Sequence, residues 1–228
     1  MSGASDPAEP RLPAGLTPWP DDSDLEESLE LTAVEVRRPR WSGLSLTDLR
    51  LEEVSLDGGD LSGSRLIDPR FRDVIVREAN LANAVLRGGS LARVEIVRCR
   101  MTGITLTETE LRDTAWRECS ADLAMLRHAT LSRVSFDACT LRRADFMGAR
   151  CDHVRFRDCV LTGASFSHAQ FTHSEFLRCR LDQVEGVEGL RGTSMDVEQM
   201  LTLAPVFAAA LGISQMMPGA RAPEATPR

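Results

Sequence analysis

The sequence predicts an all-β solenoid, a parallel β-helix with four walls, that ends in a C-terminal α-helical cap. Two regularities predict the solenoid: an apolar residue at every fifth position, and columns of identical residues at every twentieth. An apolar segment after the last repeat predicts the helical cap. The chain has 228 residues, so a solenoid of this extent leaves only short segments at its two ends.

The repeat of five runs without exception from Leu31 to Leu181, which makes 31 apolar positions. Since 43% of all residues are hydrophobic, the chance of such a series is on the order of 10⁻¹¹. The period fits neither an α-helix, with 3.6 residues per turn, nor a simple strand that alternates every two residues. A small residue usually stands two positions before each large one, which predicts a narrow, filled interior. No insertion shifts the register, so we expect no loop to project from the rod.

The regularity at twenty indicates that four pentapeptides make one turn of the coil. Residues twenty apart then stack on one wall, with coils about 4.8 Å apart. The repeats would form nearly eight coils and a rod of roughly 37 Å. Two columns are expected to form a packed core ladder: Cys99, Cys119, Cys139, Cys159 and Cys179, and Phe136, Phe156 and Phe176.

Charge divides the chain into segments. Residues 1–30 hold eight acids and one arginine, whereas residues 31–191 hold 23 acids and 24 arginines. A segment so acidic and poor in apolar residues predicts a disordered N-terminal tail over residues 1–30. We assign the β-helix to residues 31–190, a helical cap and dimerisation segment to residues 193–213, and a disordered tail to residues 214–228.

The cap is predicted from the residues that follow the last repeat. Glycines at 186, 189 and 192 end the repeat, and the stretch from Thr193 to Asp196 offers an N-cap. Pro205 is expected to kink the following helix or to start a second one. The helix carries more apolar residues than the capping of one coil requires, which favours an interface between two chains. The residues expected there are Met200, Leu203, Phe207 and Leu211.

The motif small–x–Leu/Phe–x–x resembles that of the pentapeptide-repeat proteins. It stands in the chain as Ala79-Asn80-Leu81-Ala82-Asn83 and Ala144-Asp145-Phe146-Met147-Gly148, and the resemblance covers about residues 31–185. It implies a right-handed quadrilateral β-helix. The stretch 196–212 resembles the C-terminus of actinobacterial quinolone-resistance members, which implies an end-to-end homodimer. Several members of the family bind DNA gyrase in the manner of a DNA mimic and protect it from inhibitors.

Several classes of protein are excluded by the sequence or disfavoured by it. The chain contains no phosphate-binding glycine loop, nucleophile elbow or zinc-ligand spacing, so we expect neither catalysis nor a cofactor. The formal net charge of −7 excludes a basic nucleic-acid binder. The longest apolar stretch, residues 204–213, is too short to span a membrane, and no secretory signal is visible, so we expect a cytoplasmic location.

Metal binding is also disfavoured. Stacked cysteines present their thiols in a row, whereas zinc needs ligands that converge. His153 and His173 lie one coil apart on one wall with Asp152 nearby, a group that could bind a metal weakly. Exposed histidines on a repeat surface usually have no such role, so we predict no metal site.

Two functions remain. The first is a gyrase-binding DNA mimic with a local acidic contact at Glu108, Glu110 and Asp113. The outward positions of the repeats carry nearly balanced charge, however, and no wall forms a continuous acidic stripe of the kind that imitates phosphates. The second is a structural scaffold that presents a rigid rod to another protein. Its arginines and acids would either contact that partner or pair with one another between adjacent coils.

Overall fold

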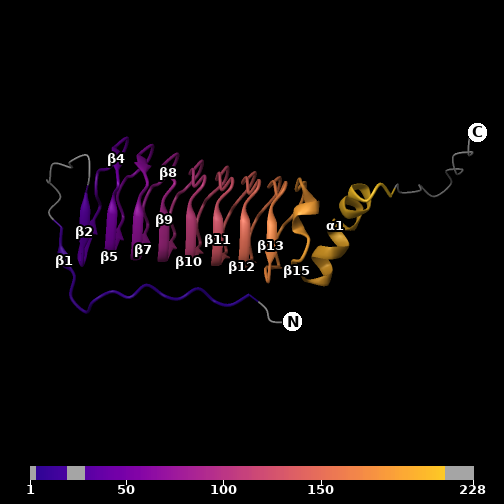
Figure 1. Ribbon diagram of the computed structural model, residues 1–228, viewed down its shortest axis with the longest axis horizontal. Coiled ribbons are helices and arrows are strands. Elements are labelled where there is room, and N and C mark those ends of the chain that lie inside the picture. Colours follow the sequence, from indigo (N-terminus) through magenta and orange to yellow (C-terminus); the bar gives the residue numbers. More distant parts are fainter. Residues whose placement is uncertain (1–3, 20–28, 214–228) are drawn as a thin grey trace, which may run out of the picture.

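Parallel strands stack in register along a rod, and each pairs with the strand one coil away (Figure 1). The computed structural model describes residues 4–19 and 29–213. The expected β-solenoid is confirmed, with about eight turns and one C-terminal helix. Within the repeats, paired residues lie twenty apart in the sequence, as in Phe136 with Phe156, so four pentapeptides make each turn.

Strands on two walls form one twelve-stranded sheet, and a third wall forms a three-stranded sheet. The first contains β1 (Thr17–Pro18), β2 (Glu30–Thr32), β3 (Val34–Arg37), β5 (Arg50–Asp57), β7 (Arg70–Arg77), β9 (Ser90–Val97), β10 (Glu110–Arg117), β11 (Thr130–Asp137), β12 (Arg150–Arg157), β13 (Gln170–Thr172), β14 (Glu175–Leu177) and β15 (Ser194–Met195). The second contains β4 (Ser45–Thr47), β6 (Arg65–Ile67) and β8 (Val85–Arg87).

Each eight-residue strand turns a corner at its fourth residue. In β11 the second, fifth and seventh residues, Leu131, Val134 and Phe136, are buried. The fourth residue, Arg133, has a φ of +53°. Similar left-handed corners recur two positions after each inward residue of the five-residue series, as at Leu123 after Ala121, where φ is +61°. The repeat predicts the inward positions, but it does not by itself predict the left-handed conformation of the corner residues.

The core is a set of stacked side chains. The ring centroids of Phe136 and Phe156 lie 4.8 Å apart and those of Phe156 and Phe176 4.7 Å apart, close to the spacing of the coils. All five cysteines of the column are buried. The Cys119 thiol donates to the carbonyls of Ile96 and Arg117, at 3.4 and 3.3 Å. A void of only about 20 Å³ remains around Trp116, so the interior is filled.

Residues 4–19, here called the strap, lie extended along the side of the rod instead of forming part of a disordered tail (Figure 1). The strap starts beside β12 and ends at β1, which pairs with β3. Four prolines limit the conformations that the free segment can adopt, which lowers the entropy lost on docking. Backbone N–H groups of the strap also donate hydrogen bonds to the buried carboxylates of Asp73 and Asp113 on the rod. The sequence alone does not show these hydrogen bonds, which offset the cost of ordering the segment. The rest of the proposed tail, residues 1–3 and 20–28, lies outside the described residues.

The C-terminal end of the rod is closed by a 3₁₀-helix, η1 (Val187–Leu190), and an α-helix, α1 (Val197–Ala210). Oδ1 of Asp196 caps α1 by accepting a hydrogen bond from the Gln199 N–H at 2.9 Å. The helix continues through Pro205 as a single element, and no second helix begins there. No helix in the described part of the chain has the length and apolar character to cross a membrane. The tail expected over residues 214–228 lies outside the described residues.

Candidate functional site

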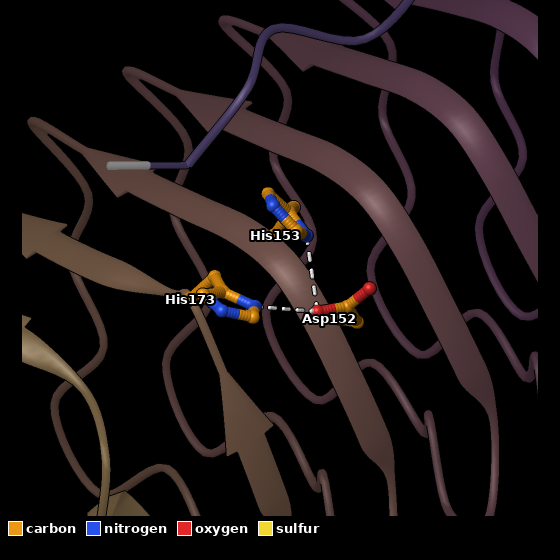
Figure 2. A group of neighbouring side chains, drawn as sticks. All are labelled: Asp152, His153 and His173. Carbon is orange, nitrogen blue, oxygen red and sulfur yellow. Dashed lines mark hydrogen bonds and ion pairs between the residues drawn. The ribbon is translucent and has the colours of Figure 1, made fainter. Parts of the chain in front are cut away.

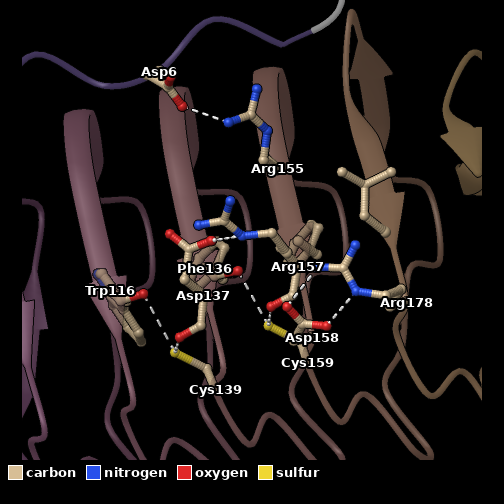
Figure 3. Close-up of polar contacts among 12 residues, drawn as sticks. Asp6, Trp116, Phe136, Asp137, Cys139, Arg155, Arg157, Asp158, Cys159 and Arg178 are labelled. Carbon is tan, nitrogen blue, oxygen red and sulfur yellow. Dashed lines mark hydrogen bonds and ion pairs between the residues drawn. The ribbon is translucent and has the colours of Figure 1, made fainter.

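The outer walls are covered by ion pairs between adjacent coils. In Figure 3, Arg178 holds Asp158 through two hydrogen bonds of 2.7 Å, and Arg157 contacts Asp137 at 2.8 Å. Hydrogen bonding to Arg178 lowers the pKa of Asp158. The same spacing of twenty residues joins Arg72 to Glu52, Arg93 to Asp73, Arg98 to Glu78, Arg133 to Asp113, Arg142 to Asp122 and Arg155 to Glu175. The arginines and acids that alternate along the sequence therefore pair largely with one another within the molecule.

The three acids expected to form a partner contact do not share one environment. Glu110 is exposed, and Glu108 lies at the surface, 3.3 Å from Arg87. Asp113 is only 9% exposed, because Arg133 holds both of its oxygens and the strap covers it. Asp113 is thus unavailable to a partner in this structure, and the expected acidic contact is reduced to two residues.

The C-terminal helix presents an apolar surface to solvent. Leu201 is 71% exposed, Leu211 77% and Met200 46%. Leu203, which the sequence analysis placed in a dimer interface, is instead 2% exposed because it packs on the last coil of its own chain. Phe207 is half-buried against the same core. The helix therefore caps the rod with one face and leaves another face uncovered.

A groove of about 740 Å³ separates α1 from the last coil, lined by residues that include Arg178, Asp196 and Gln199. The Gln199 amide donates to the Cys179 carbonyl at 3.1 Å, while its Oε1 is buried without a hydrogen-bond partner among the described residues. Arg178 and Asp196 are joined through the Arg178 backbone N–H, which donates to Oδ2 of Asp196 at 2.9 Å. These contacts hold α1 on the rod, so we interpret the groove as part of the junction between the helical cap and the last coil.

Two histidines and a carboxylate meet on the wall formed by β12 and β13 (Figure 2). Oδ1 of Asp152 lies 3.0 Å from Nδ1 of His153 and 3.2 Å from Nδ1 of His173, and the imidazole rings stack with centroids 4.6 Å apart. Partial burial acts to raise the pKa of Asp152, but hydrogen bonds from His173 and His153 lower it overall. This group offers three ligand atoms within 4.8 Å of one another. Among the described residues, it is the group of side chains that could hold a metal ion.

The buried thiols of Cys139 and Cys151 are poor nucleophiles. Burial raises the pKa of the Cys151 thiol, and hydrogen bonding to neighbouring thiols together with burial raises that of Cys139. Such thiols stay protonated at neutral pH, whereas metal binding and nucleophilic attack require the thiolate. Their role in the structure is packing.

Comparison with known proteins agrees with the architecture. Residues 90–166 and 124–185 match the family model of the pentapeptide repeat region. Residues 90–185 of the chain form a pentapeptide-repeat region. Members of this family are generally non-enzymatic structural or binding proteins. The comparison with curated proteins gives no match for this chain.

Several solved structures are similar to this chain. A trypsin-treated variant of QnrB1, described as a plasmid-mediated fluoroquinolone resistance protein, is 25% identical, with coverage of 83% of this chain and 98% of that chain and a TM-score of 0.40. HetL, described as involved in heterocyst differentiation regulation in the cyanobacterium Nostoc sp., is 19% identical, with coverage of 69% and 85% and a TM-score of 0.19. Rfr23 from the cyanobacterium Cyanothece is 15% identical, with coverage of 71% and 91% and a TM-score of 0.23.

One surface, the wall beneath the strap, was not predicted from the sequence. Ile75, Ala115 and Ser135 are uncharged outward residues of this wall, and Glu95 lies between Ile75 and Ala115 on the intervening coil. Ala115 and Ser135 are buried although they point away from the core. Uncharged outward rows also occur where no described residue covers them, as at Val85, Thr105 and Met125, so the sequence held no specific signal for this cover.

Proposed function

We propose that this pentapeptide-repeat protein is a non-catalytic binding protein, a rigid scaffold whose outer surface docks another protein. The ion pairing between coils supports the proposal best. It leaves a stiff wall of neutralised charges, and paired arginines keep further N–H groups with which to bind a partner. The filled interior supports the same function, because a void of about 20 Å³ cannot take a substrate.

DNA gyrase is the partner that we propose to test first. The resemblance of residues 196–212 to the C-terminus of quinolone-resistance proteins supports this choice. The carboxylates of the walls are largely engaged by arginines, so we place any gyrase contact at local exposed acids such as Glu108 and Glu110, without imitation of a whole DNA duplex.

A supercoiling assay with purified gyrase, with and without a quinolone, tests this partner. We expect micromolar protein to inhibit or protect the enzyme, and we expect Glu108→Gln with Glu110→Gln to weaken the effect. Glu52→Gln, whose side chain pairs with Arg72 as Glu108 pairs with Arg87, serves as the matched control. If the protein has no effect and a direct binding measurement detects no complex, gyrase is excluded and the scaffold function stands with another partner.

We propose further that two rods join through α1 into a homodimer. Support comes from Leu201 and Leu211, which are 71% and 77% exposed beside a face that already caps the rod. Leu201→Asp with Leu211→Asp should halve the mass measured by light scattering, since an apolar contact does not tolerate buried charge. Thr202→Asp introduces the same charge at an exposed polar position of α1 and should leave the mass unchanged. A monomeric wild-type protein would disprove the dimer.

A further inference from the structure

The strap rests on a part of the rod that is built to receive it. We define the strap wall by Asp73, Ile75, Asp113, Ala115, Ser135 and Arg155, which lie on β7, β10, β11 and β12. Asp73 is 5% exposed and Asp113 9% exposed, unusually low values for ionised side chains on the outside of a rod. Figure 3 shows the end of this wall, where Asp6 of the strap points toward Arg155.

The two carboxylates are oriented before they meet the strap. Arg93 holds both oxygens of Asp73 at 2.6 Å, and Arg133 holds both oxygens of Asp113 at 2.6 and 2.8 Å. These contacts leave acceptor capacity on each carboxylate. The strap supplies donors for it: the Arg11 N–H bonds Oδ1 of Asp73 at 3.0 Å, and the Ala8 N–H bonds Oδ1 of Asp113 at 3.3 Å.

The spacing of these donors matches the spacing of the coils. Ala8 and Arg11 are three residues apart, one turn of a polyproline II helix, so their N–H groups face the same side. One such turn advances about 9.3 Å, and two coils advance about 9.6 Å. Asp73 and Asp113 lie two coils apart. Pro7 and Pro10 precede segments of the strap in which this extended conformation is favoured.

Arg155 fixes the direction and the end of the strap. Its guanidinium contacts the Asp6 carboxylate and donates to the Ala4 carbonyl at 2.6 Å, while Glu175 orients it from the other side. The wall therefore recognises an acidic residue followed, two and five residues later, by backbone N–H groups. All of these features except the acid belong to the backbone, so other sequences of the same conformation can supply them.

We propose that the strap wall is a binding site for extended, proline-rich segments, which residues 4–19 occupy within their own chain. Its ligand is a polyproline II segment of another protein that carries an acidic residue ahead of the two N–H donors. Release of the strap opens this site. The site is independent of the gyrase contact and of the α1 dimer.

Full-length variants altered only in the strap test the proposal, because the rod keeps its own sequence. Ala8→Pro with Arg11→Pro removes both N–H donors but preserves the polyproline II conformation. In ¹⁵N-labelled protein, we expect the strap signals of this variant to move to the positions of a free chain. An unlabelled synthetic peptide of residues 4–19 should then bind and return the Ile75 and Ala115 amides to their wild-type positions.

Controls separate recognition from general disturbance. Glu9→Pro removes an N–H that makes no hydrogen bond to the wall among the described residues, and its strap should stay bound. In the double-proline background, Asp73→Asn with Asp113→Asn should weaken peptide binding tenfold or more, since bonds to charged acceptors are lost. The exposed Asp158→Asn should not change peptide affinity.

Three results would overturn the proposal. The strap of the double-proline variant stays bound, or the released wall does not bind the peptide in trans, or the peptide binds equally well after Asp73→Asn with Asp113→Asn. A mixture of labelled double-proline protein with unlabelled wild type gives a further outcome. If the wild-type strap fills the labelled wall, the occupant is a second copy of this chain, and the assignment within one chain is wrong.

Discussion

The corner residues show how a single φ angle constrains the sequence. Leu123 is 50% exposed and has a φ of +61°, a conformation that costs an L-residue with a β-carbon about 1–2 kcal/mol. Asparagine and glycine tolerate this region better. Histidine is also enriched among residues with a positive φ. Other corners carry histidines, such as His128 at +55° and His168 at +57°, and this preference explains why histidines recur at this position of the repeat.

We therefore expect Leu123→Asn to raise the free energy of unfolding by about 0.5–1 kcal/mol, because the corner is relaxed and little buried apolar surface is lost. Leu123→Val should lower it, since β-branching worsens the left-handed conformation. Urea-induced unfolding measures both variants, with Leu123→Ala as the control that keeps the β-carbon. A destabilised asparagine variant would contradict the argument.

Asp73 and Asp113 predict a dependence of stability on pH. Hydrogen bonding to Arg93 and Arg133, respectively, lowers the pKa of each carboxyl against the opposing effect of burial, and the strap N–H groups lower it further. A pKa lowered on folding contributes stability that is complete above the ordinary value of 3.8 and is lost as the pH falls below it.

We expect the strap to loosen and the rod to lose stability as the pH falls below about 4. The free energy of unfolding, measured from unfolding curves across this pH range, should depend less steeply on pH in Asp73→Asn with Asp113→Asn than in the wild type. Asp57→Asn, at an exposed position of β5, is the matched control. An identical pH dependence in the double variant and the wild type would show that these two groups are not responsible.

Among the elements, the strands were the most predictable and the strap the least. A repeat of five places Phe136, Phe156 and Phe176 at equivalent positions whatever surrounds them, so periodicity alone predicts their stacking. The strap depends on contacts between residues far apart, such as Arg11 with Asp73 at 62 positions and Ala8 with Asp113 at 105 positions. Residue composition predicted disorder for the strap because composition holds no information on the Asp73 and Asp113 carboxylates, which the fold places beside it.

The C-terminal helix was predictable in extent but not in orientation. Its cap and its apolar content are local properties, whereas the choice of buried face depends on the last coil. Leu203 therefore lies against the rod and Leu201 in solvent, a division that the mostly apolar sequence of α1 could not predict.

The cap of α1 gives a prediction at this scale. Asp196 accepts hydrogen bonds from the N–H groups of both Gln199 and Arg178, so it starts the helix and attaches it to the rod. Asp196→Ala should lower the free energy of unfolding by about 1 kcal/mol and speed amide exchange in α1. Asp196→Asn keeps a capping oxygen and should lose less; equal loss in the two variants would contradict a capping role.

For the molecule as a whole, stability is shared between neighbouring coils, since each coil contacts mainly the one before and the one after. Phe156 is fully buried and stacks on both Phe136 and Phe176. Phe156→Ala should therefore cost about 3–5 kcal/mol in equilibrium unfolding, because it leaves a cavity in the middle of the rod. Phe156→Leu fills most of that space and should cost less. A loss below 1 kcal/mol for the alanine variant would show that the coils are not close-packed there.

The distribution of tryptophan gives the molecule three optical reporters. The chain has three tryptophans and no tyrosine. Trp19 lies in the strap and is half-buried, Trp41 is buried near the first coils, and Trp116 is fully enclosed in the middle of the rod. Single-tryptophan proteins, made with phenylalanine at the other two positions, would report separately on strap release, fraying of the N-terminal end and opening of the core. The emission of Trp116 should be blue-shifted and resistant to aqueous quenchers until the solenoid itself unfolds.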